Sequence, residues 1–320
     1  MPELSVIICT HNPRRDYLER TLASLKAQTL PHDAWEFLLI DNASQTPLSE
    51  AWDLSWHTGS RHVREDSLGL TPARLRGIQE SKGNLLLFVD DDNLLEPDFC
   101  QVLLRLAKEH PRIGCFGAGV IEPEFETLPQ AELKPYLSSL ALRTVSKPVW
   151  SNNPQDGIIP WGAGMGVIRQ VAEAYLHDSQ QCELRQNLDR RGSSLVSGGD
   201  EEFSWTACDA GYGKGLFPEL KLIHLIAARR VERAYLLKLA EGQTFSQTLL
   251  AHIHGLPINL PAAPSTKTDI LRHLFRAQLS QTLYHANAWW NGVHKPPIEK
   301  EFAAAWRAGI EQAQKKLSVM

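Results

Sequence analysis

Apolar runs of strand length alternate with stretches of helical spacing along the first two thirds of the chain. Short runs rich in β-branched and other apolar residues predict strands, and apolar positions three or four apart predict amphipathic helices. The predicted strands cover 4–10, 37–40, a short stretch around Val63, 85–89, 114–121 and 220–224. The predicted helices cover 15–28, 73–81, 97–108 and 199–210. This alternation predicts an α/β fold with a mainly parallel central sheet and helices on both faces.

The pattern changes twice in the remainder of the chain. Between Glu122 and Pro160 the periodicity is poor and proline is frequent, which predicts a long irregular segment of functional importance. After residue 224 the spacing is helical over 233–241, 245–254, 269–290 and 299–317. The proline-rich stretch 257–264 predicts a linker. We therefore expect a catalytic domain over 1–256 and a helical C-terminal extension over 257–320.

Three consecutive carboxylates, Asp90, Asp91 and Asp92, follow the apolar run 85–89 directly. Such a run predicts a strand buried on both faces, and open α/β sheets bind ligands where such strands end. Three adjacent negative charges repel one another unless a cation lies among them, and a divalent ion that brings phosphates meets that need. The alternative is a solvated acidic turn in which Asp92 or Asn93 caps the next helix. The buried strand favours the metal–phosphate interpretation.

Composition narrows the class of protein. The chain has 320 residues, of which 43% are hydrophobic and 22% charged, and its net charge is −4. This balance is typical of a soluble globular protein and gives no broad basic surface, so we expect no nucleic-acid partner. Five cysteines without a CxxC pair favour a reducing compartment and argue against a zinc site or disulfides. With neither a signal peptide nor an apolar run of about 20 residues expected, we predict a cytoplasmic protein.

Further polar residues at predicted strand and helix ends have two interpretations each. Asp41 follows the second strand and either initiates a turn or accepts a hydrogen bond from a nucleotide. Thr10-His11-Asn12 after the first strand is equally ambiguous, and no GxGxxG is present there. The glycines spaced GxGxG from Gly162 form either a tight turn or a pocket wall.

Asp200 opens a predicted helix and therefore either favours the helix dipole, by about 0.3–1 kcal/mol, or acts as a general base. His224, at a strand end, is either a core residue or a metal ligand. Arg229, Arg230 and Arg233 follow it and either bind phosphate or are solvated helix charges.

Taken in order, these segments resemble the family-2 inverting glycosyltransferases of the glycosyltransferase-A (GT-A) fold. The matching segments are 6–12, 40–44, 69–77, 83–92, 199–203 and His224, so the resemblance covers roughly residues 3–240. It differs from the family pattern at Leu75, where asparagine is common. It also differs at Gly199, where the family often has glutamate before the aspartate.

The resemblance implies a role for each matching residue. Those expected to contact the nucleotide-sugar donor are Thr10, His11, Asn12, Arg14 or Arg15, Asp41, Arg74, Asp90 and Asp91. Asp41 is expected at the base, Arg74 at the diphosphate or ribose, and Asp90 at the ribose. Asp92 and His224 are expected to bind Mn2+ or Mg2+. Asp200 is expected to be the general base, with Glu201 as its rival.

The resemblance thus implies metal-dependent, inverting transfer of a hexosyl or N-acetylhexosaminyl group from a UDP-sugar to a hydroxyl of a saccharide or lipid-linked saccharide. Bacterial polysaccharide or glycoconjugate synthesis is the expected setting. A nucleotidyltransferase is the nearest alternative, but it should carry a basic glycine-rich loop where Thr10–Pro13 stands. A non-catalytic nucleotide-sugar-binding protein is another, against which Asp90, Asp92 and Asp200 count. The apolar positions between Leu271 and Trp290 are compatible with core packing, a homodimer contact or peripheral contact with the inner membrane face.

Overall fold

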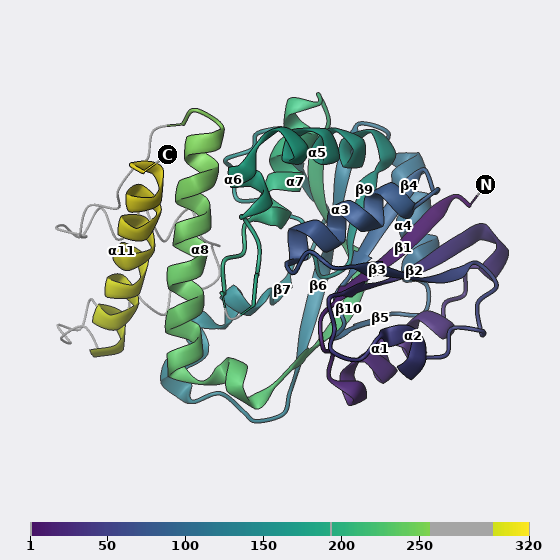
Figure 1. Cartoon of the computed structure of the whole chain (residues 1–320), viewed down its shortest axis with the longest axis horizontal. Helices are drawn as coiled ribbons and strands as arrows, with labels where there is room; N and C mark the ends of the chain where they lie inside the picture. The colour runs from purple at the N-terminus through teal and green to yellow at the C-terminus, as the bar shows by residue number, and fades with distance from the viewer. Residues whose placement is uncertain (1, 193, 257–296, 320) are drawn as a thin grey trace.

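The computed structural model describes residues 2–192, 194–256 and 297–319. In this part of the chain one mixed sheet has the order β3-β2-β1-β4-β9-β6-β10-β5, with β7 beside β6 and β8 beside β10 (Figure 1). The strands are β1 (Leu4–Thr10), β2 (Trp35–Asn42), β3 (Ser60–Glu65), β4 (Leu85–Val89), β5 (Asn93–Leu95), β6 (Ile113–Phe125), β7 (Arg143–Thr144), β8 (Val149–Ser151), β9 (Met165–Ile168) and β10 (Gly213–Ile226). Strands β3, β2, β1 and β4 are parallel neighbours, as are β6 and β10, while β9 is antiparallel to both β4 and β6. The predicted α/β fold with a mainly parallel sheet is confirmed.

Helices cover both faces of the sheet. They are α1 (Arg15–Lys26), α2 (Leu48–Ala51), α3 (Leu70–Glu80), α4 (Phe99–Glu109), α5 (Arg169–Gln181), α6 (Glu183–Gln186), α7 (Gly199–Asp209), α8 (Arg233–Ile253) and α11 (Pro297–Leu317), with 3-10 turns at His32–Ala34, Ala131–Leu140 and Ala228–Val231. Four predicted helices are present within a few residues of their expected ends. Helix α3 begins earlier than predicted because Gly69 adopts a φ of +141° and Pro72 is tolerated in the first turn. Helix α8 is continuous, so the predicted break near residue 243 is wrong.

The interval 122–160 is less irregular than predicted. Strand β6 continues to Phe125, and the 3-10 turn Ala131–Leu140 and strands β7 and β8 follow it. Strand β7 pairs with β6, so that Arg143 lies opposite Ile121, and β8 pairs with β10. These short pairings attach the segment to the sheet, which local sequence patterns do not reveal.

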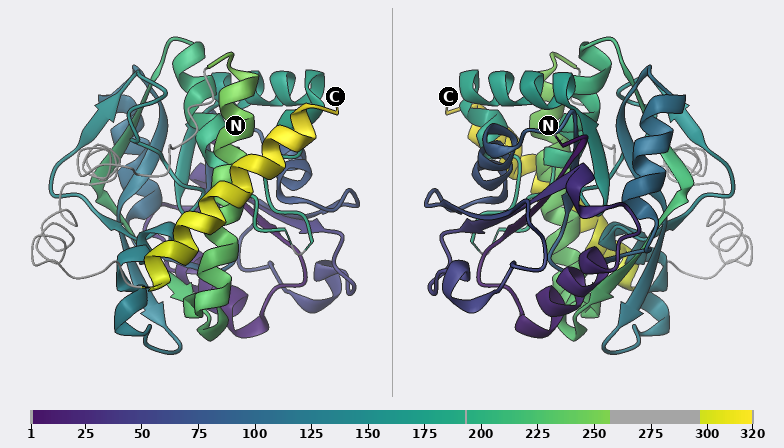
Figure 2. Two further views of the ribbon diagram at one scale, coloured as in Figure 1. Left: turned by 90° about the vertical axis from the view of Figure 1, so that its left-hand side faces the viewer. Right: turned by 90° about the vertical axis from the view of Figure 1, so that its right-hand side faces the viewer.

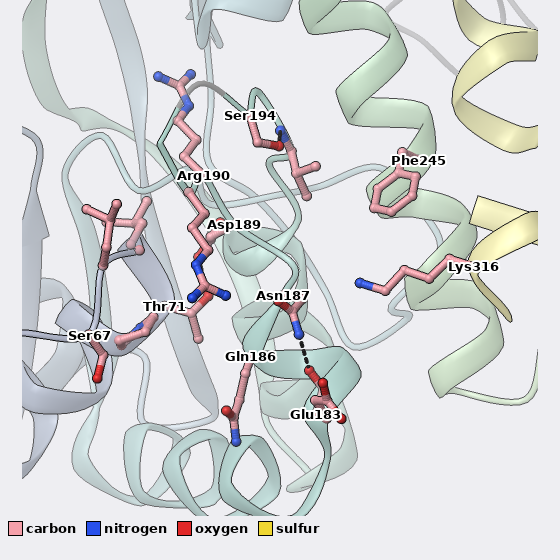
Figure 3. Close-up of a pocket in the computed structure, with 16 residues that line it drawn as sticks. Ser67, Thr71, Glu183, Gln186, Asn187, Asp189, Arg190, Ser194, Phe245 and Lys316 are labelled. Carbon is pink, nitrogen blue, oxygen red and sulfur yellow. Dashed lines mark hydrogen bonds between the residues drawn. The ribbon is translucent and has the colours of Figure 1, made fainter. Parts of the chain in front are cut away.

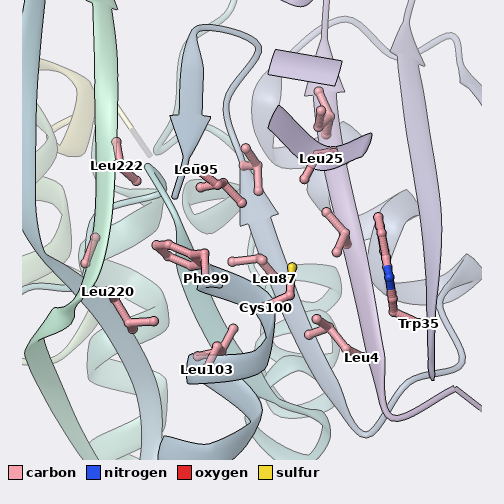
Figure 4. Packing of buried hydrophobic residues seen from close by; sticks show 14 of the residues in the cluster. Leu4, Leu25, Trp35, Leu87, Leu95, Phe99, Cys100, Leu103, Leu220 and Leu222 are labelled. Atoms are coloured by element: carbon pink, nitrogen blue, oxygen red, sulfur yellow. The ribbon is translucent and has the colours of Figure 1, made fainter. Parts of the chain in front are cut away.

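Alternating side chains of the central strands build two cores, one on each face of the sheet. Leu85, Leu87 and Val89 of β4 join one cluster with α1 and α4 (Figure 4). Leu86 and Phe88 join the other cluster with α3, α5 and α7. All five residues of β4 are buried, which confirms that this strand is buried on both faces. Burial of each such side chain stabilises the fold by about 1.5–3 kcal/mol.

Helices α8 and α11 run side by side in the same direction at one end of the molecule (Figures 1 and 2). Phe302, near the start of α11, packs with Leu236 near the start of α8. Ala313, near the end of α11, packs with Leu250 near the end of α8. The predicted linker 257–264, the predicted helix 269–290 and its apolar positions lie outside the described residues. No helix in the described ranges combines the length and hydropathy that crossing a bilayer requires.

Candidate active site

The turn after β4 carries the three carboxylates and leads into β5. It is closed by the Asn93 amide donating to the Asp90 carbonyl oxygen at 3.2 Å. In the other direction, the Asp90 amide donates to Asn93 Oδ1, also at 3.2 Å. Helix α4 begins at Phe99 with Asp98 at its N-cap, so the alternative in which Asp92 or Asn93 caps that helix is wrong.

Strand pairing brings His224 to this turn. Strand β5 is antiparallel to β10, with Asn93 opposite His224, and the Leu225 amide donates to the Asp92 carbonyl oxygen at 2.8 Å. Asp92 Oδ2 lies 3.3 Å from His224 Nε2 and 2.8 Å from Arg230 Nη1. Burial favours protonation of Asp92, but the His224 imidazole and the Arg230 guanidinium outweigh it and hold the pKa of that carboxyl well below its usual range.

Asp92 and His224 fit a divalent ion such as Mn2+. Their oxygen and nitrogen are close enough to bind one ion, and carboxylate with imidazole is a suitable donor set. Arg230 already places a positive charge against both groups, at 2.8 Å from Asp92 and 3.0 Å from His224 Nε2. In the described ranges no group of three or more His, Cys, Asp or Glu residues is arranged to hold a metal. The other ligands of an ion here would therefore be water or substrate oxygens.

The other two carboxylates of the turn are half-buried and face different partners. Asp91 accepts a hydrogen bond from the Thr10 hydroxyl and so lies against the end of β1. Asp90 interacts electrostatically with Asp92, Arg74 and Asp200. Burial and the charge of Asp92 raise the pKa of Asp90 to about 6 and that of Asp91 to about 7. An additional cation near Asp92 would relieve this repulsion.

Asp200 lies in the first turn of α7 and is held from two sides. Its Oδ2 accepts the Gly162 amide at 2.8 Å, and its Oδ1 lies 2.6 Å from Arg74 Nη2. Gly162 thus lies in a turn, with Gly164 at a φ of +73°, and packs closely on Asp200, which is the tight-turn role of the two predicted. A Cβ at this position would overlap Arg74 Nη2 and lie 2.9 Å from Asp200 Oδ1. Only glycine allows this approach.

Arg74 is buried between two carboxylates. Besides Asp200, its Nη1 donates to Asp189 Oδ2 at 3.1 Å. Asp189 also accepts the Thr71 hydroxyl at 3.1 Å and the Gly199 amide at 3.0 Å. Burial disfavours the Arg74 charge, but both carboxylates outweigh it and raise the Arg74 pKa well above its ordinary value. The structure thus places Arg74 beneath the predicted base, and its contact with the donor stays a prediction.

The predicted nucleotide-binding residues form a hydrogen-bonded loop pair at the ends of β1 and β2. His11 Nδ1 donates to the Asn42 carbonyl oxygen at 2.7 Å. Asn12, with a φ of +47°, accepts the Gln45 amide on its Oδ1 at 2.9 Å. Asp41 accepts the Ser44 and Leu48 amides and an Arg64 N–H at 2.8–3.1 Å. Asp41 therefore has the predicted turn role, and its contact with a base stays a prediction.

Two predicted residues are paired with carboxylates other than those of the acidic turn. Arg14 is paired with Asp16 and Glu126, both at 2.5 Å, and Arg15 with Glu19. These guanidinium groups are exposed and already have carboxylate partners on the surface. Nothing in this arrangement directs either toward Asp92, and their contact with phosphates stays a prediction.

Glu201, the alternative base, has a different environment from Asp200. Burial raises the pKa of Glu201 to about 7, and the nearest opposing charge is Lys214. Lys214 is fully buried and pairs with Asp156 at 3.2 Å. Asp200, in contrast, interacts with both Asp90 and Arg74. The surroundings of Asp200 therefore connect it to the acidic turn.

A hollow of about 490 Å³ lies on the other side of Asp189 and Thr71. Figure 3 shows Thr71, Asp189 and Arg190 on one side of it, and Phe245 of α8 and Lys316 of α11 on the other. None of the three turn carboxylates lines it. Since Thr71 and Asp189 hold Arg74, the hollow begins one layer of side chains from Asp200.

Sequence reasoning missed three residues of the site: Asp189, Arg143 and Trp161. Asp189 precedes α7 in a stretch with no periodic signal, and its partner Arg74 is 115 residues away. The Arg143 guanidinium carbon lies 3.2 Å from the Trp161 ring centroid. The position of Trp161 directly before the GxGxG glycines could have indicated a site residue. Arg143, a lone arginine in a proline-rich segment, gives no such indication.

Comparisons with known proteins agree with this arrangement. The family model described as "Glycosyl transferase family 2" matches residues 5–160. Polypeptide N-acetylgalactosaminyltransferase 14 of Homo sapiens is 32% identical over 117 residues, which are 36% of this chain and 21% of that protein. The chain thus spans less than half the length of the curated relatives it matches.

Two solved structures are similar in fold. Mannosyltransferase PcManGT from Pyrobaculum calidifontis, solved with GDP-Man and Mn2+, superposes with a TM-score of 0.59 at 15% identity, over 98% of this chain and 87% of that one. GalNAc-T7, solved with UDP, GalNAc and Mn2+, has a TM-score of 0.50 at 20% identity, over 69% of this chain and 43% of that one. The chain has the GT-A fold, and its residues 5–160 match the model of glycosyltransferase family 2.

Proposed function

We propose that this protein is an inverting glycosyltransferase that moves a sugar from a nucleotide-diphosphate sugar, a UDP-sugar in the first instance, to an acceptor hydroxyl. The observation that carries the proposal is the presence of two carboxylate centres, each of which is held by an arginine. One is Asp200, fixed by Gly162 and Arg74, and the other is Asp92 beside His224. Asp90 interacts electrostatically with both Asp92 and Asp200.

Asp200 is the proposed general base. Its carboxylate removes the proton of the acceptor hydroxyl as that oxygen attacks the anomeric carbon from the face opposite the leaving group. Arg74 and the Gly162 amide hold the carboxylate in a single orientation. A positioned base of this kind contributes about 100- to 10,000-fold to the rate. One displacement without a covalent sugar–enzyme intermediate inverts the anomeric centre.

The leaving nucleoside diphosphate is proposed to lie at Asp92. Asp92 and His224 would hold Mn2+ or Mg2+, which supplies Lewis-acid stabilisation of the diphosphate when bound. Arg230 adds a positive charge at the same place and is free to pair with phosphate oxygens once it leaves Asp92. Asp90 is proposed to bind the ribose, and Asp91 keeps Thr10 in place.

The nucleoside is proposed to lie against the loop pair that contains Thr10, His11, Asn12 and Asp41. Their mutual hydrogen bonds fix the loops before any ligand binds, which lowers the entropy cost of binding. GalNAc-T7 was solved with UDP and PcManGT with GDP-Man, so both bases are candidates in the donor screen.

The acceptor is proposed to be a saccharide or a lipid-linked saccharide in bacterial polysaccharide or glycoconjugate synthesis. This part of the proposal follows from the resemblance of the sequence to family 2. We further propose that the protein is cytoplasmic, and that it binds the inner membrane face peripherally if the acceptor is lipid-linked.

A donor screen tests the proposal. Purified protein with Mn2+ is incubated with a panel of UDP-, GDP- and dTDP-sugars, and release of nucleoside diphosphate is measured with and without acceptors. We expect slow release from one or two donors that a chelator and Asp92→Asn abolish, whereas the exposed Asp33→Asn control retains it. For Asp200→Asn we expect donor binding without transfer. Conversion of a nucleotide sugar to a nucleoside triphosphate and a sugar 1-phosphate when pyrophosphate is added would instead identify a nucleotidyltransferase, and binding without turnover a non-catalytic protein.

A further inference from the structure

Arg143 is a buried cation with two N–H groups that lack a hydrogen-bond partner among the described residues. The residue is only 7% exposed, and its buried Nε and Nη2 atoms donate no hydrogen bond to any described residue. Burial lowers the Arg143 pKa to about 9, and only Asp200 opposes this shift. An unpaired buried charge is costly, so such an arrangement needs a compensating partner. In the described part of the chain no carboxylate lies within ion-pair distance of it.

Trp161 fixes the orientation of this guanidinium. The ring lies against its flat face, with 3.2 Å from the guanidinium carbon to the ring centroid. A cation over an aromatic face is favourable, but it uses the face of the guanidinium and leaves its N–H edges free. Those edges are the part that binds a carboxylate or a phosphate with two parallel hydrogen bonds. Arg143 is therefore preorganised for an oxyanion.

The position of Arg143 connects it to the proposed base. Gly162, the residue after Trp161, donates its amide to Asp200 Oδ2. The Asp200 charge acts on Arg143, although the two groups make no ion pair, since Asp200 is paired with Arg74 instead. A substrate group at Arg143 would therefore belong to the molecule that also faces Asp200.

We propose that Arg143 binds an oxyanion, a carboxylate or a phosphate, carried by the acceptor whose hydroxyl faces Asp200. This inference rests on the proposed function, in which Asp200 activates that hydroxyl. The acceptor is thus an acidic saccharide or a sugar phosphate, and Arg143 selects it over a neutral one. Trp161 acts through Arg143 as a positioning residue.

A binding experiment tests the inference independently of turnover. Thermal unfolding of the full chain is followed with millimolar D-glucuronate, glucose 1-phosphate, methyl glucoside or sodium chloride. We expect one or both acidic ligands to raise the Tm of the wild type and of the exposed-arginine control Arg112→Gln, and neither to raise that of Arg143→Gln. The ligand that acts distinguishes carboxylate from phosphate. An equal response in Arg143→Gln, or none in the wild type, overturns the inference.

The unliganded variant gives a second readout. If Arg143 served only the fold, Arg143→Met would lower the Tm. We expect it to match or exceed the wild-type Tm, because methionine still packs on Trp161 without burying an unpaired charge. A clear loss of Tm in Arg143→Met would count against a role in binding.

Kinetics complete the test. With an acidic acceptor, Arg143→Gln should raise KM about 10- to 100-fold, as expected for lost hydrogen bonds to a charged group, while the nucleoside diphosphate affinity stays unchanged. Wild-type transfer to neutral acceptors alone, with Arg143→Gln equally active, would reject the inference and leave the proposed function standing. Arg143-dependent binding of the acids without transfer to any acceptor would reject the proposed function and support the anion site.

Discussion

Arg230 and a divalent ion cannot both occupy Asp92 Oδ2 and His224 Nε2. Arg230 Nη1 lies 2.8 Å from the first atom and 3.0 Å from the second, so the guanidinium must move before an ion binds there. The two side chains of the ion pair are only 12% and 16% exposed, so solvent screens it weakly. Its loss costs about 1.5–3 kcal/mol, the range for hydrogen bonds between charged groups. Arg230→Gln removes this competition.

We therefore expect Arg230→Gln to bind Mn2+ about 10- to 150-fold more tightly than the wild type when no nucleotide is present. Calorimetric titration with Mn2+ measures the change, and the neighbouring exposed Arg229→Gln should bind like the wild type. With Mn2+ saturating, the same variant should bind the nucleoside diphosphate more weakly, because a phosphate partner is lost. An unchanged Mn2+ affinity in Arg230→Gln would refute the reasoning, since the ion would then bind elsewhere.

Three further predictions concern the base, a buried carboxyl and the C-terminal helix. Gly162→Ala should lower kcat for transfer at least 100-fold with unchanged nucleotide affinity, because the new methyl group overlaps Arg74 and displaces Asp200; an active variant would show that this contact is dispensable. Glu201 has a folded-state pKa of about 7 against an ordinary 4.5, so as pH rises from 4 to 8 the wild type should lose up to about 3 kcal/mol more unfolding free energy than Glu201→Gln, in which Asp90 and Asp91 still titrate; equal losses in the two proteins, measured by urea denaturation, would contradict the burial of Glu201. Phe302→Ala should cost about 3–5 kcal/mol in the same assay, and the more exposed Trp306→Ala much less; equal effects would mean that α11 is not part of the stable core.

The fold was predictable because its strands and helices carry strong local patterns. The apolar run of β4 and the leucines of α1 and α4 point to the same cores that the structure forms. Strand β5 is three residues long and β9 four, so neither gives a periodic signal, yet both pairings shape the site. The antiparallel β5–β10 pair is what brings Asp92 to His224 across more than 130 residues of chain. Such contacts depend on tertiary packing.

The sequence allowed the types and positions of the candidate site residues to be predicted, but not which side chains they contact. Asp92, His224 and Asp200 were identified from motifs at element ends, and in the structure Asp92 contacts His224 while Asp200 contacts Arg74. The ion-pair partners of the arginines were not predicted: Arg14 pairs with Glu126 on the surface, and Arg74 pairs with Asp200. A long flexible side chain can reach several sites, so sequence position fixes the location of its Cα but not that of its charge.

The two arginines that hold the proposed catalytic carboxylates differ in how firmly they are held, and this difference has a functional meaning. Arg74 is almost fully buried within α3, between Asp200 and an Asp189 that is itself fixed by Thr71 and a backbone amide. Arg230 comes from a short 3-10 turn after β10 and contacts Asp92 and His224. Replacing Arg74 would leave buried carboxylates unpaired, whereas displacing Arg230 exchanges one cation for another. Arg74 therefore holds the proposed base Asp200 throughout, whereas Arg230 neutralises Asp92 only until the metal ion and the donor bind together.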